Sequence, residues 1–227
     1  MSAVDRLRRV WRPRSKLRSE LAYWEDRRRT GGELERGVPF YAWMFTEPFG
    51  LDASFYAGKR LLDVGCGPRG SLEWAAQAAE RVGLDPLAAR YAALQSRPHA
   101  MTYVQGAAER MPFPDDRFDV VSTINSLDHV DDLDAALAEI RRVVSPGGLW
   151  LLLVDVEHGP TVTEPQRIGW DVVERLTDSW TPVRRRDYER PSENLYDNLR
   201  AAAEYDHGDP RARPAVVSAV LGRRSTG

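Results

Sequence analysis

A glycine-rich turn follows an apolar run in Leu61-Leu62-Asp63-Val64-Gly65-Cys66-Gly67-Pro68-Arg69-Gly70. Its glycines allow the backbone to turn tightly and to approach a bound ligand closely. The same spacing suits a dinucleotide, so the turn alone indicates only a nucleotide-type ligand. Asp63 narrows the choice, because a carboxylate there suits a ligand that carries an ammonium group better than one that presents a pyrophosphate.

Asp85 ends the next apolar stretch, twenty residues after Gly65. A carboxylate at that place can accept hydrogen bonds from both hydroxyls of a ribose, as adenosine-containing ligands require. The alternative is an ordinary turn residue before Pro86. The position of Asp85 after a predicted strand, together with the glycine turn, favours ribose binding.

Ionisable side chains also follow later predicted strands. His129 is the best candidate for a general base, because an ordinary histidine pKa lies near working pH and its loop should lie beside the ligand cleft. Asp128 or Asp155 could orient the ring. The competing interpretation is structural: Asp128 caps a helix and His129 packs against it. His99 and His158 are weaker candidates.

Composition describes a soluble globular protein, with 42% apolar and 29% charged residues in 227 and a net charge of −2. The single cysteine, Cys66, excludes an intrachain disulfide framework and suits a reducing compartment. No C-x-x-C or H-E-x-x-H spacing occurs, so no metal is expected. The start lacks an apolar signal region and no run is long enough to span a membrane, so a cytoplasmic location is expected.

Charge is uneven along the chain, because residues 1–29 hold ten Arg or Lys and only four acids. Such an arm suits RNA, an anionic membrane or an acidic substrate, although a solvated helix face is the more ordinary explanation. The remainder of the chain is acidic, which argues against a nucleic-acid partner.

Strands and helices alternate from residue 60, a rhythm that predicts an α/β domain with a doubly wound, mostly parallel sheet. Strands are predicted at Arg60–Val64, Arg81–Leu84, Met101–Gln105, Phe118–Ile124, Leu149–Val154, Val183–Asp187 and Ala215–Leu221, and helices at Leu72–Ala79, Leu87–Leu94, Leu133–Val144 and Glu164–Leu176.

The predicted domain organisation has two parts. Residues 1–57 form a helical arm with an aromatic segment, Phe40–Phe45, that either closes over a cleft as a lid or docks the arm on the domain. Residues 58–227 form the ligand-binding domain, in which 155–227 supply substrate-side strands and an insertion. That insertion is a polar stretch, Glu189–Arg213, between the last two strands; it is either functional or a surface loop.

Five motifs in order resemble class I S-adenosylmethionine-dependent methyltransferases of the ubiquinone/menaquinone-methyltransferase-like kind, over roughly residues 58–156. Their order and spacing are more specific than any one motif, and the resemblance implies a Rossmann-like sheet of seven strands. The motifs are Leu62-Asp63-Val64-Gly65-Cys66-Gly67, Val82-Gly83-Leu84-Asp85, Ala108-Glu109-Arg110-Met111-Pro112-Phe113, Phe118-Asp119-Val120-Val121 and Glu139-Ile140-Arg141-Arg142-Val143-Val144-Ser145-Pro146-Gly147-Gly148.

The resemblance implies a site for S-adenosylmethionine, with S-adenosylhomocysteine as the product. The methionine end would lie at residues 63–67, the ribose at residue 85, the adenine at residues 107–109 and the sulfonium above residue 125. The implied residues are Asp63, Gly65, Cys66, Gly67, Asp85, Pro86, Ala107, Ala108, Glu109 and Asn125.

Two departures from the family pattern stand out. Many relatives have Gly-Asp-Ala-Glu where this chain has Gly106-Ala107-Ala108-Glu109, which puts a side-chain contact with the adenine amino group in doubt. Relatives that methylate sugar hydroxyls often have a histidine pair where this chain has Asp128-His129, and some have an acid that matches Asp155.

The expected function is methyl transfer to a small-molecule acceptor, a hydroxyl of a sugar or secondary metabolite, with His129 removing the proton. The alternatives are an NAD(P)-dependent oxidoreductase, an RNA methyltransferase that uses the basic arm, and a non-catalytic scaffold. The sequence leaves the oligomeric state open.

Overall fold

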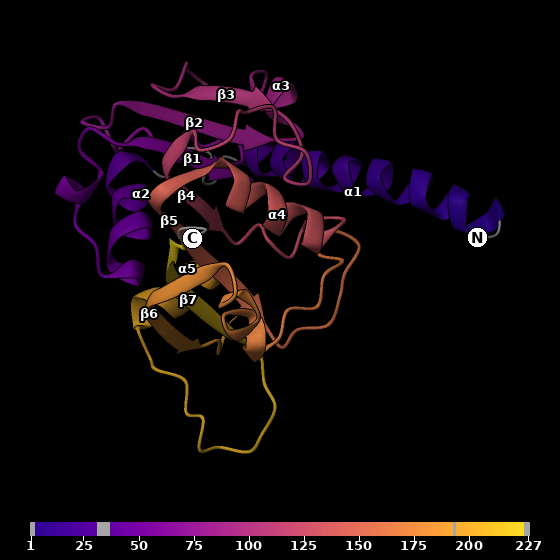
Figure 1. Cartoon of the computed structure of the whole chain (residues 1–227). Coiled ribbons are helices and arrows are strands. Elements are labelled where there is room, and N and C mark those ends of the chain that lie inside the picture. Colours follow the sequence, from indigo (N-terminus) through magenta and orange to yellow (C-terminus); the bar gives the residue numbers. More distant parts are fainter. Residues whose placement is uncertain (1–2, 31–36, 193, 225–227) are drawn as a thin grey trace.

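The computed structural model describes the backbone of residues 3–30, 37–192 and 194–224, and the side chains of 15–30, 40–192 and 194–224. Its centre is a seven-stranded sheet with the order β3-β2-β1-β4-β5-β7-β6 (Figure 1). The strands are β1 (Arg60–Val64), β2 (Glu80–Asp85), β3 (Thr102–Gln105), β4 (Phe118–Ile124), β5 (Val144–Val156), β6 (Trp180–Glu189) and β7 (Ala215–Arg223).

Neighbouring strands are parallel from β3 through β5, and β7 alone runs against its two neighbours, β5 and β6. The mostly parallel, doubly wound Rossmann-like sheet predicted from the sequence is therefore confirmed. In β5 the side chains of Leu149–Val154 alternate between two apolar layers, one on each face of the sheet. A strand covered on both faces requires such a continuous apolar run.

The helices are α1 (Ala3–Arg29), α2 (Gly37–Thr46), α3 (Ala88–Tyr91), α4 (Leu133–Val143) and α5 (Leu195–Ala201). One face of the sheet packs against α4 and the other against α2 and α5. Asp132 caps α4, since its carboxylate accepts a hydrogen bond from the backbone N–H of Ala135 at 3.1 Å. No helix of the described residues is both long and apolar enough to cross a bilayer.

Residues 1–30 are predicted from the sequence as one or two polar helices. Within the described part of this range the structure has one helix, α1, which reaches out beyond the sheet (indigo in Figure 1). Leu17, Leu21 and Trp24 lie on one side of α1, at the i, i+4 and i+7 positions. They pack against a small apolar cluster around α3, formed by Leu87, Tyr91 and Leu94. The C-terminal half of α1 is therefore docked on the domain.

The predicted helix Leu72–Ala79 is wrong, because this segment is a series of turns. Its end is hydrogen-bonded to the residues just before β1: Gly58 N–H donates to the Gln77 carbonyl at 2.8 Å, and Ala79 N–H donates to the Lys59 carbonyl at 2.9 Å. Trp74 is packed edge-on against Tyr56. These tertiary contacts take the place of helical ones.

The predicted helix Glu164–Leu176 is also wrong: only two 3₁₀ turns form, Trp170–Val172 and Glu174–Leu176. Gln166 bonds instead to the loop after β4. The predicted helix Leu87–Leu94 shortens to α3, and α5 lies inside what was described as a polar excursion.

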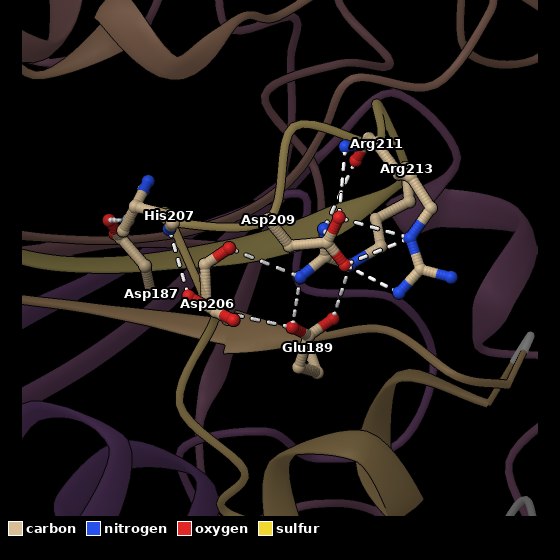
Figure 2. A network of polar contacts seen from close by, with 8 residues as sticks. Asp187, Glu189, Asp206, His207, Asp209, Arg211 and Arg213 are labelled. Carbon is tan, nitrogen blue, oxygen red and sulfur yellow. Dashed lines mark hydrogen bonds and ion pairs between the residues drawn. The ribbon is translucent and has the colours of Figure 1, made fainter.

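The segment between α5 and β7 is held to β6 by a network of charged groups, which Figure 2 shows. Arg213 pairs with Glu189, and His207 Nε2 lies 2.9 Å from Asp187 Oδ2. The Arg213 guanidinium also lies 4.1 Å from the centre of the Tyr205 ring. Exposed pairs of this kind each contribute roughly 0–1 kcal/mol, so the network sets the path of this loop more than the stability of the fold.

Candidate functional site

A pocket of about 840 Å³ lies at the carboxyl ends of the parallel strands, where open α/β sheets bind their ligands. Its volume is near the upper end of the range of about 300–1,000 Å³ found for small-molecule sites. All ten residues expected to bind the cofactor line it: Asp63, Gly65, Cys66, Gly67, Asp85, Pro86, Ala107, Ala108, Glu109 and Asn125.

Asp63 is a buried carboxylate at the end of β1. Its oxygens accept hydrogen bonds from the hydroxyls of Ser71 at 2.5 Å and Ser122 at 2.7 Å. Burial raises the pKa of Asp63 to about 6, and these two hydrogen bonds oppose that shift. Since neither partner carries a positive charge, a cationic group bound in the pocket would stabilise the ionised carboxylate.

Asp85 holds the glycine turn in place. One carboxylate oxygen accepts from the Gly67 N–H at 3.2 Å and the other from the Leu87 N–H at 2.8 Å. Burial raises the pKa of Asp85. Cys66 is buried in the same turn, and burial raises the pKa of its thiol, so the cysteine is not an activated nucleophile.

Gly65 needs to be glycine for two reasons: its φ of +76°, and a Cβ that would lie 2.4 Å from the Cβ of Ser126. Gly147 has a similar φ of +74° but open space around it. We expect Gly65→Ala to lower the melting temperature by more than Gly147→Ala does. The Gly147→Ala variant has only the backbone strain of about 1–2 kcal/mol, which corresponds to a decrease of roughly 2–8 °C. Calorimetry of both variants measures the difference; equal shifts would contradict the steric argument.

Asn125 follows β4 in the left-handed conformation, with φ of +51°, and its N–H donates to the Leu153 carbonyl at 2.8 Å. Its side-chain Oδ1 is buried and lacks a hydrogen-bond partner among the described residues. A buried amide oxygen without a donor is costly, and in a pocket it indicates that a ligand completes its hydrogen bonds.

Helices α1 and α2 both contribute side chains to the lining of the pocket. From α1 the lining includes Glu20 and Trp24, and from the aromatic segment in α2 it includes Tyr41. The Arg69 guanidinium lies 4.6 Å from the centre of the Trp24 ring. The helical spacing of Leu17, Leu21 and Trp24 was the available indication that this part of the basic arm packs inward.

His129 lies in a group of carboxylates rather than beside one orienting acid. Its Nδ1 is 2.6 Å from Glu20 Oε1, and its Nε2 is 3.8 Å from Glu164 Oε1. Among the described residues, Glu20 is the hydrogen-bond partner of the ring, in the role that the sequence suggested for Asp128 or Asp155. Glu20 belongs to α1 and is far from His129 in the sequence, so its contact with His129 could not be predicted from neighbouring residues.

Burial lowers the pKa of His129, but the hydrogen bond with Glu20 and the negative charges of Asp128, Glu20 and Glu164 outweigh burial. The pKa of His129 is therefore raised to about 9. The surrounding carboxylates therefore favour the protonated ring more than an ordinary histidine pKa would indicate.

Asp128 and Asp155 lie behind this group, outside the pocket lining. Asp128 Oδ2 is 3.5 Å from His158 Nε2, and this carboxylate raises the pKa of His158 to about 9. Asp155 Oδ2 is 3.3 Å from Arg190 Nε; burial raises the pKa of Asp155 to about 6, although the Arg190 charge opposes the shift. His158, ranked low from the sequence, thus belongs to this cluster, whereas His99 contacts Tyr103 instead.

Part of the chain is similar to known methyltransferases. Residues 62–152 match the family model described as a methyltransferase domain. Sterol 24-C-methyltransferase erg6 of Aspergillus fumigatus is 33% identical over 125 residues, which are 51% of this chain and 33% of that protein. Ubiquinone/menaquinone biosynthesis C-methyltransferase UbiE of Shewanella piezotolerans is 47% identical over 53 residues, which are 23% of this chain and 21% of that protein.

The matches to these curated relatives thus span a third or less of the relatives' own length. Among solved structures, geranyl diphosphate C-methyltransferase from Streptomyces coelicolor A3(2), crystallised with Mg²⁺, geranyl diphosphate and S-adenosyl-L-homocysteine, superposes with a TM-score of 0.56. The identity is 19%, and the match covers 76% of each chain. This similarity extends the shared fold beyond the matched domain.

Proposed function

We propose, on the premise that residues 62–152 form a class I S-adenosylmethionine-dependent methyltransferase domain, that this chain transfers a methyl group to a hydroxyl of a small-molecule acceptor. The observation that carries the proposal is a single pocket that joins the cofactor residues to the group around His129. Methyl donor and acceptor can therefore meet in one enclosed volume.

The residues present fit S-adenosylmethionine, which supplies a methyl group already activated on a cationic sulfur. Buried Asp63 offers a carboxylate to the ammonium group, and Asp85 offers one to the ribose hydroxyls. The side-chain Oδ1 of Asn125, which has no hydrogen-bond partner among the described residues, would be stabilised by a polar or positively charged group of the ligand. Arg69, buried in the same loop, is the cation that we assign to the carboxylate of the cofactor.

The acceptor would enter between α1 and the loop after β5. His129, Glu20 and Glu164 line the pocket there, and Tyr196 of α5 belongs to the same lining. The protein's main contribution is to align acceptor oxygen, methyl and sulfur, a positional effect that can reach about 7–11 kcal/mol. A substrate-side role for the α5 segment follows from the same lining.

A hydroxyl acceptor must also lose a proton. Two carboxylates, Glu20 and Glu164, share the neighbourhood of the one imidazole of His129, so the group as a whole can take up that proton. We assign His129 to contact with the acceptor, and Asp128 and Asp155 to positioning through their charges.

A carbon acceptor is the second candidate, because the relatives named above are C-methyltransferases for sterols, quinones and geranyl diphosphate. The RNA alternative loses support, because the C-terminal half of α1 packs on the domain and Lys16 is bound to Asp131 at 2.7 Å. Lys16 is therefore one cation of the basic arm that is already paired within the protein.

Cofactor affinity should depend on pH through Asp63. The ammonium group needs an ionised carboxylate, and the pKa of Asp63 in the free protein is raised to about 6. We therefore expect the affinity for S-adenosylmethionine to be constant above pH 7 and to fall by up to about tenfold per pH unit below 6. Isothermal titration from pH 4.5 to 8 measures this, and Asp63→Asn should flatten the profile; a flat wild-type profile would contradict it.

The proposed function is tested with methyl-labelled S-adenosylmethionine and a panel of metabolite extracts. Mass spectrometry identifies labelled products, and the ¹³C shift of the transferred methyl group distinguishes oxygen from carbon acceptors. Labelled O-methyl products support the proposal. Binding of NAD without binding of S-adenosylmethionine would overturn it in favour of an oxidoreductase.

A further inference from the structure

The acceptor end of the pocket carries a donor set suited to a metal ion. Asp128, His129 and Glu164 each offer one ligand atom, and these atoms lie within 4.8 Å of one another. Three ligands bound to one ion at about 2.0–2.2 Å lie about 3.3–3.8 Å from one another. The distance of 3.8 Å between His129 Nε2 and Glu164 Oε1 already meets this spacing. The widest separation in the group must close by about 1 Å as the ion binds.

Asp128 gives an independent indication that something is bound here. Its side chain is 1% exposed, yet its Oδ1 has no hydrogen-bond partner among the described residues. The other oxygen lies 3.5 Å from His158. A buried carboxylate oxygen without a partner is costly, and a cation in the cluster would remove that cost.

The imidazole of His129 is held as metal-bound histidines are held. Glu20 Oε1 lies 2.6 Å from Nδ1, so a proton on Nδ1 is fixed by a carboxylate and Nε2 points toward Glu164. A carboxylate on the far ring nitrogen fixes the tautomer and strengthens the other nitrogen as a ligand.

The two loops that carry these ligands are fixed to each other. The Gln166 N–H donates to the Asp128 carbonyl at 3.2 Å, and its side-chain Nε2 donates to the Val130 carbonyl at 3.0 Å. The nearby cation Lys16 does not neutralise the cluster, because its Nζ is bound to the His129 carbonyl oxygen and to Asp131. The carboxylates are therefore arranged before any ligand arrives.

From this geometry we infer that Asp128, His129 and Glu164 bind one divalent transition-metal ion at the acceptor end of the pocket. One imidazole nitrogen with two carboxylates, and no thiolate, suits Mn²⁺ or Zn²⁺ better than Mg²⁺ or Ca²⁺, which prefer oxygen ligands only. Glu20 is a positioning residue that acts through His129.

The role of this ion in catalysis rests on the proposed function, because the ion would bind the hydroxyl group of the acceptor. His129 and Glu164 line the pocket, so the open coordination positions face the acceptor. A hydroxyl oxygen bound there would have a lower pKa and a fixed position. Its proton would leave to a pocket carboxylate or to water, and its oxygen would form the bond to the methyl carbon as the bond from that carbon to sulfur breaks.

Direct metal binding to the full chain tests the inference without any measurement of activity. After treatment with EDTA, the protein is titrated with Mn²⁺, and the electron paramagnetic resonance signal of free Mn²⁺ reports uptake; Zn²⁺ is titrated by calorimetry. We expect one ion per chain, and at least a tenfold loss of affinity in both Asp128→Asn and Glu164→Gln. The matched control is Asp134→Asn, an exposed acid in the first turn of α4.

Binding of S-adenosylhomocysteine shows that each variant is folded. Absence of Mn²⁺ and Zn²⁺ uptake by the wild-type protein, or equal uptake by the wild type and both cluster variants, would overturn the metal site. The two proposals fail separately: methyl transfer that persists in EDTA without metal uptake removes only the metal site, whereas metal uptake at this cluster without methyl transfer to any acceptor removes only the proposed function.

Discussion

Replacement of His129 by alanine should lower kcat by about 10²–10⁴-fold and leave the affinity for S-adenosylmethionine nearly unchanged. The side chain lies between Glu20 and Glu164 at the proposed acceptor end, and Asp63 and Asp85, the carboxylates proposed to bind the cofactor, keep their own hydrogen bonds in the variant. Steady-state kinetics and calorimetric titration with S-adenosylhomocysteine separate the two effects.

The control for this variant is His207→Ala, which removes an exposed histidine paired with Asp187 in the loop before β7. It should retain the wild-type kcat. If His129→Ala also retained it, the imidazole would have no part in the reaction, and an acceptor that needs no proton removal would be indicated.

Asp85→Asn should weaken binding of S-adenosylmethionine and S-adenosylhomocysteine by about 10–150-fold, because hydrogen bonds to a charged group contribute about 1.5–3 kcal/mol. Asparagine keeps the size of the side chain and one oxygen for the backbone N–H of Leu87. It cannot accept from both ribose hydroxyls while it also holds the Gly67 turn. Calorimetric titration measures the affinity.

In Asp85→Asn, the effect of losing a carboxylate that stabilises the fold must be distinguished from the effect of losing a ligand of the ribose. Asp119→Asn is the comparison, since Asp119 binds Arg60 at 2.7 Å and does not line the pocket. That variant should lower thermal stability without changing cofactor affinity. Wild-type affinity in Asp85→Asn would place the ribose elsewhere in the pocket.

The strands, and the edge of the sheet at which the pocket lies, were predictable from the sequence. Turns and apolar runs are local features, and parallel strands bring their carboxyl ends to one edge of the sheet. Residues as far apart as Asp63 and Asn125 could therefore be assigned to one site without knowledge of packing. The structure places both in the lining of the same pocket.

The helices at 72–79 and 164–176 were wrongly predicted for one reason. In both segments the local pattern is compatible with a helix, but long-range hydrogen bonds replace the helical ones: to Gly58 and Lys59 in the first, and to the loop after β4 in the second. Such competition between local and tertiary bonding is not visible in apolar periodicity.

The sequence by itself determined the order of the strands and the edge of the sheet at which the pocket lies, because glycine turns, strand ends and their spacing are properties of neighbouring residues. The tertiary structure alone decided the surroundings of His129. Glu20 and Glu164 are separated from it by 109 and 35 residues, and they reach it only because α1 packs on the cluster around α3 and Gln166 fixes the loop after β5. The pairing of a charged side chain over such distances depends on the packing of the elements that carry it.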